Sequence, residues 1–399
     1  MNIGGQHMDF DKMIKRRNTD SVKWDLAISQ SHMDDLLPLW VADMDFAAPD
    51  CVVKALTNRA AHGIYGYTYT DEAYKDAIVN WMTSRHHWHI EKEWLLYTIG
   101  IVPAIYFAVH AFTEPGDSII IQQPVYGPFS NAVIKNKRKL VNSSLIFNGG
   151  RYEMDFDDFE QKVIKNNVKL FILCSPHNPV GRVWTKEELC RIGDICVKHH
   201  VLVVSDEIHH DIVYKGNKHI PFASLGEEYA NCCITCTSPG KTLNMAALQN
   251  ANLIISNPEI RNILKTFTEN LGLTEPGLMG MLACKTAYTE GHDWLDALLR
   301  YLNENKEYAK SYIQKNIPNI HAVDPEGTYL LWMDFKNTML SDQELNDFLM
   351  KKAKVQLNAG TSFGEEGKGF MRLNFACPRS VLVQALERIE KAINSTGIY

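Results

Sequence analysis

Five short apolar runs recur through the middle of the sequence, and amphipathic stretches separate them. The runs are 118–123 (SIIIQQ), 169–175 (KLFILCS), 201–207 (VLVVSDE), 232–238 (CCITCTS) and 252–256 (NLIIS). Runs this short and this apolar are typical of strands that are covered on both faces. The alternation therefore predicts an α/β fold, in which helices sandwich a central, mostly parallel sheet.

The amphipathic stretches carry their own helix signals. Thr185 and Glu188 have the spacing of a capping box, and Leu189, Ile192 and Cys196 follow on one face of the predicted helix. The last stretch, 380–393, repeats apolar residues at helical spacing and predicts an amphipathic helix that closes the chain. Because no repeat or low-complexity linker is present, we expect any second domain to pack against the first.

Charge and composition narrow the classes of partner. The formal net charge is −6 and the pI is about 6.2, with no basic stripe, which argues against nucleic acid. The nine cysteines are scattered, the start lacks an apolar signal core, and no uninterrupted apolar run approaches membrane-spanning length. We expect a cytoplasmic protein with reduced thiols, a small-molecule substrate and no membrane partner.

The spacing of cysteines and histidines gives little support for a metal site. Cys233 and Cys236 form a C-x-x-C pair, but no second pair at zinc spacing follows it, so buried strand cysteines are the favoured interpretation. The histidines at 86–89 and 199–200 lack a carboxylate or thiol partner at ligand spacing. They are interpreted as surface or packing residues, and no metal is expected.

Unusual polar residues follow three of the apolar runs. Asn178 comes after the second run, Asp206 ends the third, and Lys241 follows the fourth within TSPGK. Ligands of open α/β sheets bind at the carboxyl ends of the strands, where these residues would meet. A further strand-like stretch ends near Gly100, before an apolar helix whose free N–H groups could hold a phosphate.

An amine, a carboxylate, an amide and a phosphate-binding helix start together suit pyridoxal 5′-phosphate. Lys241 would form a Schiff base with its aldehyde, which explains a lysine at the mouth of a buried strand. Asp206 would pair with the pyridine nitrogen, and Asn178 would donate to the ring oxygen. Each residue also has an ordinary alternative: an exposed lysine, a helix N-cap and a turn before Pro179.

Several motifs resemble those of one enzyme superfamily. SPHNPVG (175–181), SDEIHHDIVY (205–214), TSPGKTLNMAAL (237–248) and MRLNFACPR (371–379) resemble the motifs of fold-type I pyridoxal-phosphate enzymes, the aspartate aminotransferase superfamily. PLWVADMDFAAP (38–49) and YGYTYTDEAY (65–74) resemble more narrowly the branch of cystathionine β-lyases and C-S lyases that includes the MalY and PatB proteins. The likeness covers nearly the whole chain, with the motifs in the expected order.

The resemblance implies roles for matching positions. Lys241, Asp206 and Tyr126 would be catalytic, with Tyr126 over the ring face. Arg372 would bind the substrate α-carboxylate, helped by Asn178 and by Trp40 in the entrance strip 32–46. The residues implied around the phosphate and the ring are the backbone of Ile101 and Val102, the Ser238 hydroxyl, His209, and Tyr67 (or Tyr65) of a partner subunit. A site shared between chains implies a homodimer.

Two positions depart from the common aminotransferase pattern. His209 stands where those enzymes often have tyrosine, and Gln249 stands where an arginine often holds the phosphate. The lyase branch resembles this sequence at both positions. The resemblance also implies three parts: a segment 1–49 packing with the small domain, a large cofactor-binding domain 50–290, and a small α+β domain 291–399.

The predicted function is a pyridoxal-phosphate-dependent C-S β-lyase. It would cleave L-cystathionine or related cysteine S-conjugates to pyruvate, ammonia and a thiol. A class I/II aminotransferase stays open, because both reactions use the same motif residues. From another class, a regulatory protein that binds a protein partner and keeps a vestigial cofactor site also stays open.

Overall fold

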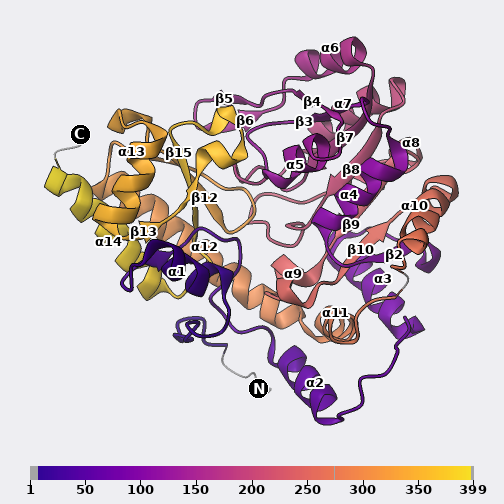
Figure 1. The fold of residues 1–399 in the computed structure, drawn as a ribbon, viewed down its shortest axis with the longest axis horizontal. Helices are drawn as coiled ribbons and strands as arrows, with labels where there is room; N and C mark the ends of the chain where they lie inside the picture. Colours follow the sequence, from indigo (N-terminus) through magenta and orange to yellow (C-terminus); the bar gives the residue numbers. More distant parts are fainter. Residues whose placement is uncertain (1–7, 274, 397–399) are drawn as a thin grey trace.

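The computed structural model describes residues 8–273 and 275–396, and a seven-stranded sheet forms its centre (Figure 1). The strand order is β2-β10-β9-β8-β7-β3-β4, and only β10 within this sheet runs antiparallel to its neighbours. The strands are β2 Leu95–Thr98, β3 Ser118–Ile121, β4 Lys139–Asn142, β7 Val168–Cys174, β8 Leu202–Asp206, β9 Cys233–Thr237 and β10 Ala251–Ile254. The five apolar runs are confirmed as strands, and so is the mostly parallel sheet.

Helices cover both faces of this sheet, as the apolar runs predict. Ile119 and Ile121 of β3 point into one apolar cluster, whereas Ile120 points into the other, because successive side chains of a strand alternate. One face packs against α4 Ile101–Phe112, α5 Pro128–Ile134 and α10 Pro258–Asn270. The other packs against α3 Glu72–His86, α6 Phe156–Asn166, α7 Lys186–Lys198, α8 Glu227–Ala230 and α11 Leu278–Glu290.

The start of α7 confirms the capping-box prediction. The Thr185 hydroxyl accepts a hydrogen bond from the Glu188 N–H at 3.2 Å, and the Glu188 carboxylate accepts one from the Thr185 N–H at 2.8 Å. The N–H groups of Thr185 and Glu188, which have no partner within the helix, are thereby hydrogen-bonded. The predicted face of Leu189, Ile192 and Cys196 is buried.

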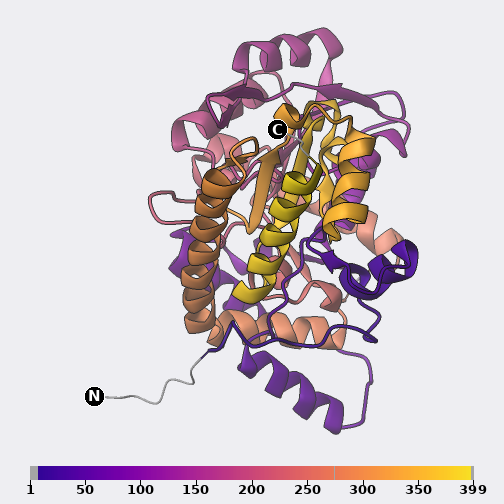
Figure 2. The same cartoon turned by 90° about the vertical axis from the view of Figure 1, so that its left-hand side faces the viewer.

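A second, smaller unit lies beside the central sheet. Its antiparallel sheet has the order β11-β12-β15-β14. The strands are β11 His321–Val323, β12 Leu330–Asp334, β14 Asn358–Ala359 and β15 Phe370–Asn374. Figure 2 shows α12 His292–Asn316 and α14 Arg379–Thr396 side by side over this unit. The closing helix is confirmed as α14.

The N-terminal segment packs with this smaller unit. β1 Leu37–Pro38 pairs in parallel with β13 Val355–Gln356, and Figure 1 shows the indigo segment beside the yellow one. The Leu39 carbonyl also accepts from the Asn374 N–H at 2.9 Å. The domain limits at residues 50 and 290 stay a prediction. Residues 1–7, 274 and 397–399 of the three predicted parts lie outside the described part of the chain.

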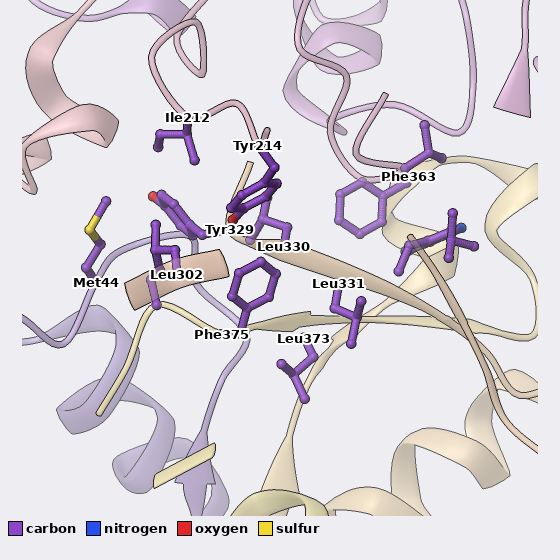
Figure 3. Close-up of a cluster of buried hydrophobic side chains, with 14 of the residues drawn as sticks. Met44, Ile212, Tyr214, Leu302, Tyr329, Leu330, Leu331, Phe363, Leu373 and Phe375 are labelled. Atoms are coloured by element: carbon purple, nitrogen blue, oxygen red, sulfur yellow. The ribbon is translucent and has the colours of Figure 1, made fainter. Parts of the chain in front are cut away.

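An apolar cluster joins the two units. Figure 3 shows Ile212 and Tyr214 of the large unit above Leu330 and Phe375 of the small one. Tyr329 lies between them, and Met44 of the entrance strip lies on the same side. The entrance strip is thus built into the junction. No helix among residues 8–273 and 275–396 has the length and apolar character to span a membrane.

Candidate active site

Neighbouring parallel strands bring the predicted polar residues to one edge of the sheet. Asp206 ends β8, Asn178 lies in the loop after β7, and Lys241 lies in the short helix α9 Pro239–Thr242 after β9. In the register, Asp206 faces Cys174 on one side and Cys236 on the other. The meeting of strand ends that the sequence predicts is therefore observed.

Lys241 presents an amine of unusual acidity at this edge. Its Nζ donates a hydrogen bond to the Ala42 carbonyl at 2.5 Å, although the side chain as a whole keeps some exposure. Burial of the amine lowers the pKa of Lys241 to about 8, with Asp43 acting in the opposite direction and Arg372 adding to the decrease. A lysine with this pKa is partly neutral near physiological pH, which a nucleophile or a base requires.

Asp206 is a buried carboxyl group without a direct ion-pair contact among the described residues, although the charge of Lys241 acts on it from a greater distance. Its Oδ1 accepts from the Ile208 N–H at 3.1 Å, and within the described residues no lysine, arginine or histidine forms an ion pair with it. Burial raises its pKa to about 7, and the charge of Glu207 acts in the same direction. A protonated ring nitrogen is a partner that would compensate this desolvation.

Arg372 is a buried cation without an anion. It lies on β15, is 2% exposed, and donates from Nη1 to Asn178 Oδ1 at 3.0 Å and from Nη2 to the Trp40 carbonyl at 2.7 Å. Its buried Nε has no hydrogen-bond partner among the described residues. Burial lowers the pKa of Arg372 to about 10. A guanidinium in this state is suited to a carboxylate that comes from outside the chain.

Three further residues at this edge, Asn178, His209 and Tyr126, have uncharged side chains. The bond from Arg372 fixes the Asn178 amide oxygen, which leaves the Nδ2 donor for another acceptor. Burial holds the pKa of His209 well below its usual range, and its Nδ1 has no partner within the described chain. The Tyr126 ring is half-buried, and burial raises its pKa.

The phosphate-binding residues are placed in part. α4 begins at Ile101 after Gly100, and the N–H groups of a first helical turn have no partner within the helix. The Ser238 hydroxyl instead donates to the Asn250 carbonyl at 2.7 Å and accepts from the Gly240 N–H at 3.0 Å. Tyr67 is fully exposed in the loop between α2 Asp50–Ala61 and α3, so the single chain does not bring it to this site.

Sequence reasoning missed how the entrance strip is held. Ala42 O accepts from the Tyr329 hydroxyl at 2.9 Å as well as from Lys241. Asn374 Nδ2 donates to the carbonyls of Val41 at 2.7 Å and Asp43 at 2.5 Å. These acceptors are backbone atoms, for which a sequence carries no side-chain signal.

The donor set fits pyridoxal 5′-phosphate, which the sequence predicts. A partly neutral buried amine, a buried carboxyl without a direct ion-pair contact in the described part of the chain and an amide donor meet at one sheet edge. A helix start lies at the end of β2, which points the same way as β8. Within the described residues, each of these groups lacks the partner that the cofactor would supply.

The comparisons with known proteins agree with this geometry. The aminotransferase class I and II model matches residues 34–389. The cystathionine β-lyase PatB of Bacillus subtilis (strain 168) is 43% identical over 387 residues, which covers 97% of this chain and 100% of that protein. Cystalysin from Treponema denticola, whose structure contains pyridoxal 5′-phosphate, is 38% identical with a TM-score of 0.95, covering 98% of this chain and 100% of that chain. The pyridoxal-phosphate-bound C-S lyase from Staphylococcus hominis is 36% identical with a TM-score of 0.90, covering 96% and 97%.

Proposed function

Because this chain belongs to the aminotransferase class I and II family, we propose that it is a pyridoxal-phosphate-dependent C-S β-lyase. It cleaves L-cystathionine or a related cysteine S-conjugate to pyruvate, ammonia and a thiol. The similarity to PatB and to the C-S lyase of Staphylococcus hominis supports this reaction. The observation that carries the proposal is the buried, anion-free Arg372 beside the amine of Lys241.

Residues of four elements would hold the cofactor. Lys241 offers the amine for the aldehyde carbon, and Asp206 accepts from the pyridine nitrogen. Asn178 Nδ2 donates to the ring oxygen and Tyr126 covers the ring. The backbone of Ile101 and Val102 would bind the phosphate, and so would Ser238 once its hydroxyl turns away from the Asn250 carbonyl, while His209 would stay neutral beside the ring. When bound, the cofactor supplies an electron sink for negative charge at the substrate Cα.

The protein's own residues then bind, orient and move a proton. Arg372 binds the α-carboxylate with its planar guanidinium group. The Trp40 carbonyl lies beside this group and accepts a hydrogen bond from its Nη2. Lys241 Nζ would take the Cα proton, and a Cα=Cβ double bond would form as the Cβ–S bond breaks and the thiolate leaves. Hydrolysis of the released enamine by water would then give pyruvate and ammonia. We propose that segment 32–46 moves with the small domain, hinged near residues 50 and 290, and excludes water from the site.

The rate of cofactor binding should depend on pH through Lys241 and Asp206. Lys241 must be neutral to bind the aldehyde, and Asp206 must be ionised to accept from the ring nitrogen. With pKa values of about 8 and about 7, both reactive forms increase as the pH rises from 6 to 8. We expect the association rate of cofactor with cofactor-free protein, followed by visible absorbance, to rise over this range and to level off above about pH 9, where Lys241 is mostly neutral. A rate that rises only near pH 10, with the circular dichroism unchanged, would contradict the lowered pKa of Lys241.

We also propose a homodimer in which Tyr67 of one subunit reaches the phosphate held by its partner. The exposed loop that carries Tyr65, Tyr67 and Tyr69 offers this reach. Tyr67→Phe should weaken cofactor binding about tenfold, the value of one hydrogen bond to a charged group, whereas Tyr65→Phe should not. In a hybrid dimer, one subunit carries Tyr67→Phe and the other carries Lys241→Ala. If the site is shared, one of its two sites then has both a native Lys241 and a native Tyr67, and tight cofactor binding should return at that site. Hybrids that bind cofactor no better than Tyr67→Phe would contradict the shared site.

The competing reaction is transamination, which needs an amino acceptor. The cofactor-loaded protein is incubated with L-cystine, with and without an added 2-oxo acid, and ammonia is measured. A β-lyase releases ammonia over many turnovers without the 2-oxo acid. If no ammonia formed in either sample, and the amino group were transferred only when the 2-oxo acid is present, the protein would be an aminotransferase and not a lyase.

A further inference from the structure

A second group of titratable side chains lies buried behind the candidate active site, around Asp211. The Asp211 carboxylate accepts from Trp81 Nε1 at 3.1 and 3.2 Å and from the Thr242 hydroxyl at 2.7 Å. Its oxygens also lie 2.8 Å from His86 Nε2 and 3.1 Å from His210 Nε2. All five residues are buried. Their chemistry is not used by the proposed mechanism.

Two histidines and a carboxylate could also hold a metal ion, and His86, His210 and Asp211 lie close enough together. The Asp211 oxygens, however, already accept hydrogen bonds from Trp81 and Thr242. The same oxygens lie at 2.8 Å from His86 Nε2 and 3.1 Å from His210 Nε2, so direct contacts between the side chains occupy the centre of the group. The cluster is therefore a hydrogen-bond network around an ionised carboxylate.

The neighbours of His210 favour its charged form. Nδ1 lies 2.5 Å from the Glu207 carbonyl, and Nε2 lies 3.1 Å from Asp211 Oδ2. Nδ1 is at hydrogen-bond distance from the carbonyl, whereas the Nε2 contact is an ion-pair distance only, since Nε2 has no hydrogen-bond partner within the described residues. Burial opposes a positive charge on His210, but Asp211 and Glu207 together outweigh burial and raise the pKa of His210. Burial lowers the pKa of His86 to about 4, so His86 donates to Asp211 as a neutral ring.

Thr242 connects this network to Lys241, its neighbour in the chain. Helix α9 has only four residues, and its own backbone bonds are few, such as Leu243 N–H to the Pro239 carbonyl at 2.9 Å. Side-chain bonds hold the turn from two sides. Thr242 binds Asp211, and Asn244 binds the Met44 N–H and carbonyl at 3.1 Å each. The position of Lys241 thus depends on these anchors.

We propose that Asp211, which lies between His86, His210 and Thr242, is a positioning residue for Lys241. Its bond to the Thr242 hydroxyl fixes α9, so that Lys241 Nζ meets the substrate Cα proton at the required distance and angle. This inference rests on the proposed function, in which Lys241 moves that proton. Carboxylate binding by Arg372 comes from β15 and does not depend on the Thr242 bond.

The test follows proton transfer at Cα without any C–S cleavage. The cofactor-loaded protein is incubated with L-alanine in D₂O, and NMR measures the exchange of the Cα proton for deuterium. Thr242→Val keeps the side-chain shape but removes the donor to Asp211. We expect exchange at saturating L-alanine to slow at least about tenfold, with less than about a twofold change in the half-saturating concentration, because a small misplacement of a reacting group is costly. Thr242→Ser restores the hydroxyl and should restore the rate.

Thr235→Val is the matched control. Thr235 lies on β9 and is buried like Thr242, but its hydroxyl contacts Cys233 rather than Asp211. Its exchange rate should equal that of the native protein. Native exchange in Thr242→Val, or an equal loss in Thr242→Val and Thr242→Ser, would overturn the inference. If Thr242→Val does not fold, His210→Gln tests the network from its other end, and native exchange there overturns the inference. A native protein that exchanges the proton but cleaves no thioether refutes the lyase proposal and leaves this test intact.

Discussion

Replacing Lys241 by alanine should lower kcat for L-cystathionine by about 10³-fold or more while the protein still folds. A positioned proton-transfer group contributes about 10² to 10⁴ to the rate, and Lys241 also provides the amine that holds the cofactor. The fold should tolerate the change, because Lys241 makes one hydrogen bond, to Ala42, and its buried amine costs desolvation. The visible absorbance of lysine-bound cofactor should disappear as well.

The measurements for this variant are kcat, the visible spectrum and thermal unfolding. Lys186→Ala, which removes an exposed lysine at the start of α7, serves as the control and should leave all three unchanged. If Lys241→Ala retained the native visible spectrum, the cofactor assignment would be wrong.

Replacing Arg372 by leucine should lower kcat/KM for L-cystathionine by about 10²-fold or more. Two charge-assisted hydrogen bonds to a carboxylate are worth about 3 kcal/mol or more together, and each 1.4 kcal/mol is a factor of ten. Arg372→Lys keeps a positive charge but loses the planar fork, so an intermediate kcat/KM is expected.

A substrate without the α-carboxylate provides the matched comparison for Arg372. The decarboxylated analogue of the cysteine conjugate should be a poor substrate for the native protein, and Arg372→Leu should not make it much poorer. Equal losses in kcat/KM for both compounds would mean that Arg372 acts on the fold or the cofactor rather than on the carboxylate.

The fold and the centre of the site could be predicted because their signals are local in the sequence. Each apolar run marks one strand, and the polar residue that follows it lies at the strand's carboxyl end. Asp206 and Lys241 were predicted in this way, and adjacent parallel strands place them together. The resemblance to a known superfamily added Arg372, which spacing alone would not connect to the other two.

Contacts across the sheet could not be predicted from spacing. His86 was expected to be a surface or packing residue, and it is buried, but its carboxylate partner Asp211 comes from another element and could not be found from sequence spacing. Lys241 donates a hydrogen bond to the backbone carbonyl of Ala42. Every residue has such a carbonyl, so the sequence does not indicate which one Lys241 contacts. The reach of Tyr67 depends on a second chain and stays a prediction.

The measurement that most directly tests the account is the product balance from L-cystathionine. Cofactor-loaded protein is incubated with L-cystathionine and no added 2-oxo acid, and pyruvate, ammonia and homocysteine are measured over time. The β-lyase assignment predicts the three products in equal amounts over many turnovers per site. Conversion of the cofactor to its amine form, without pyruvate or thiol, would contradict it.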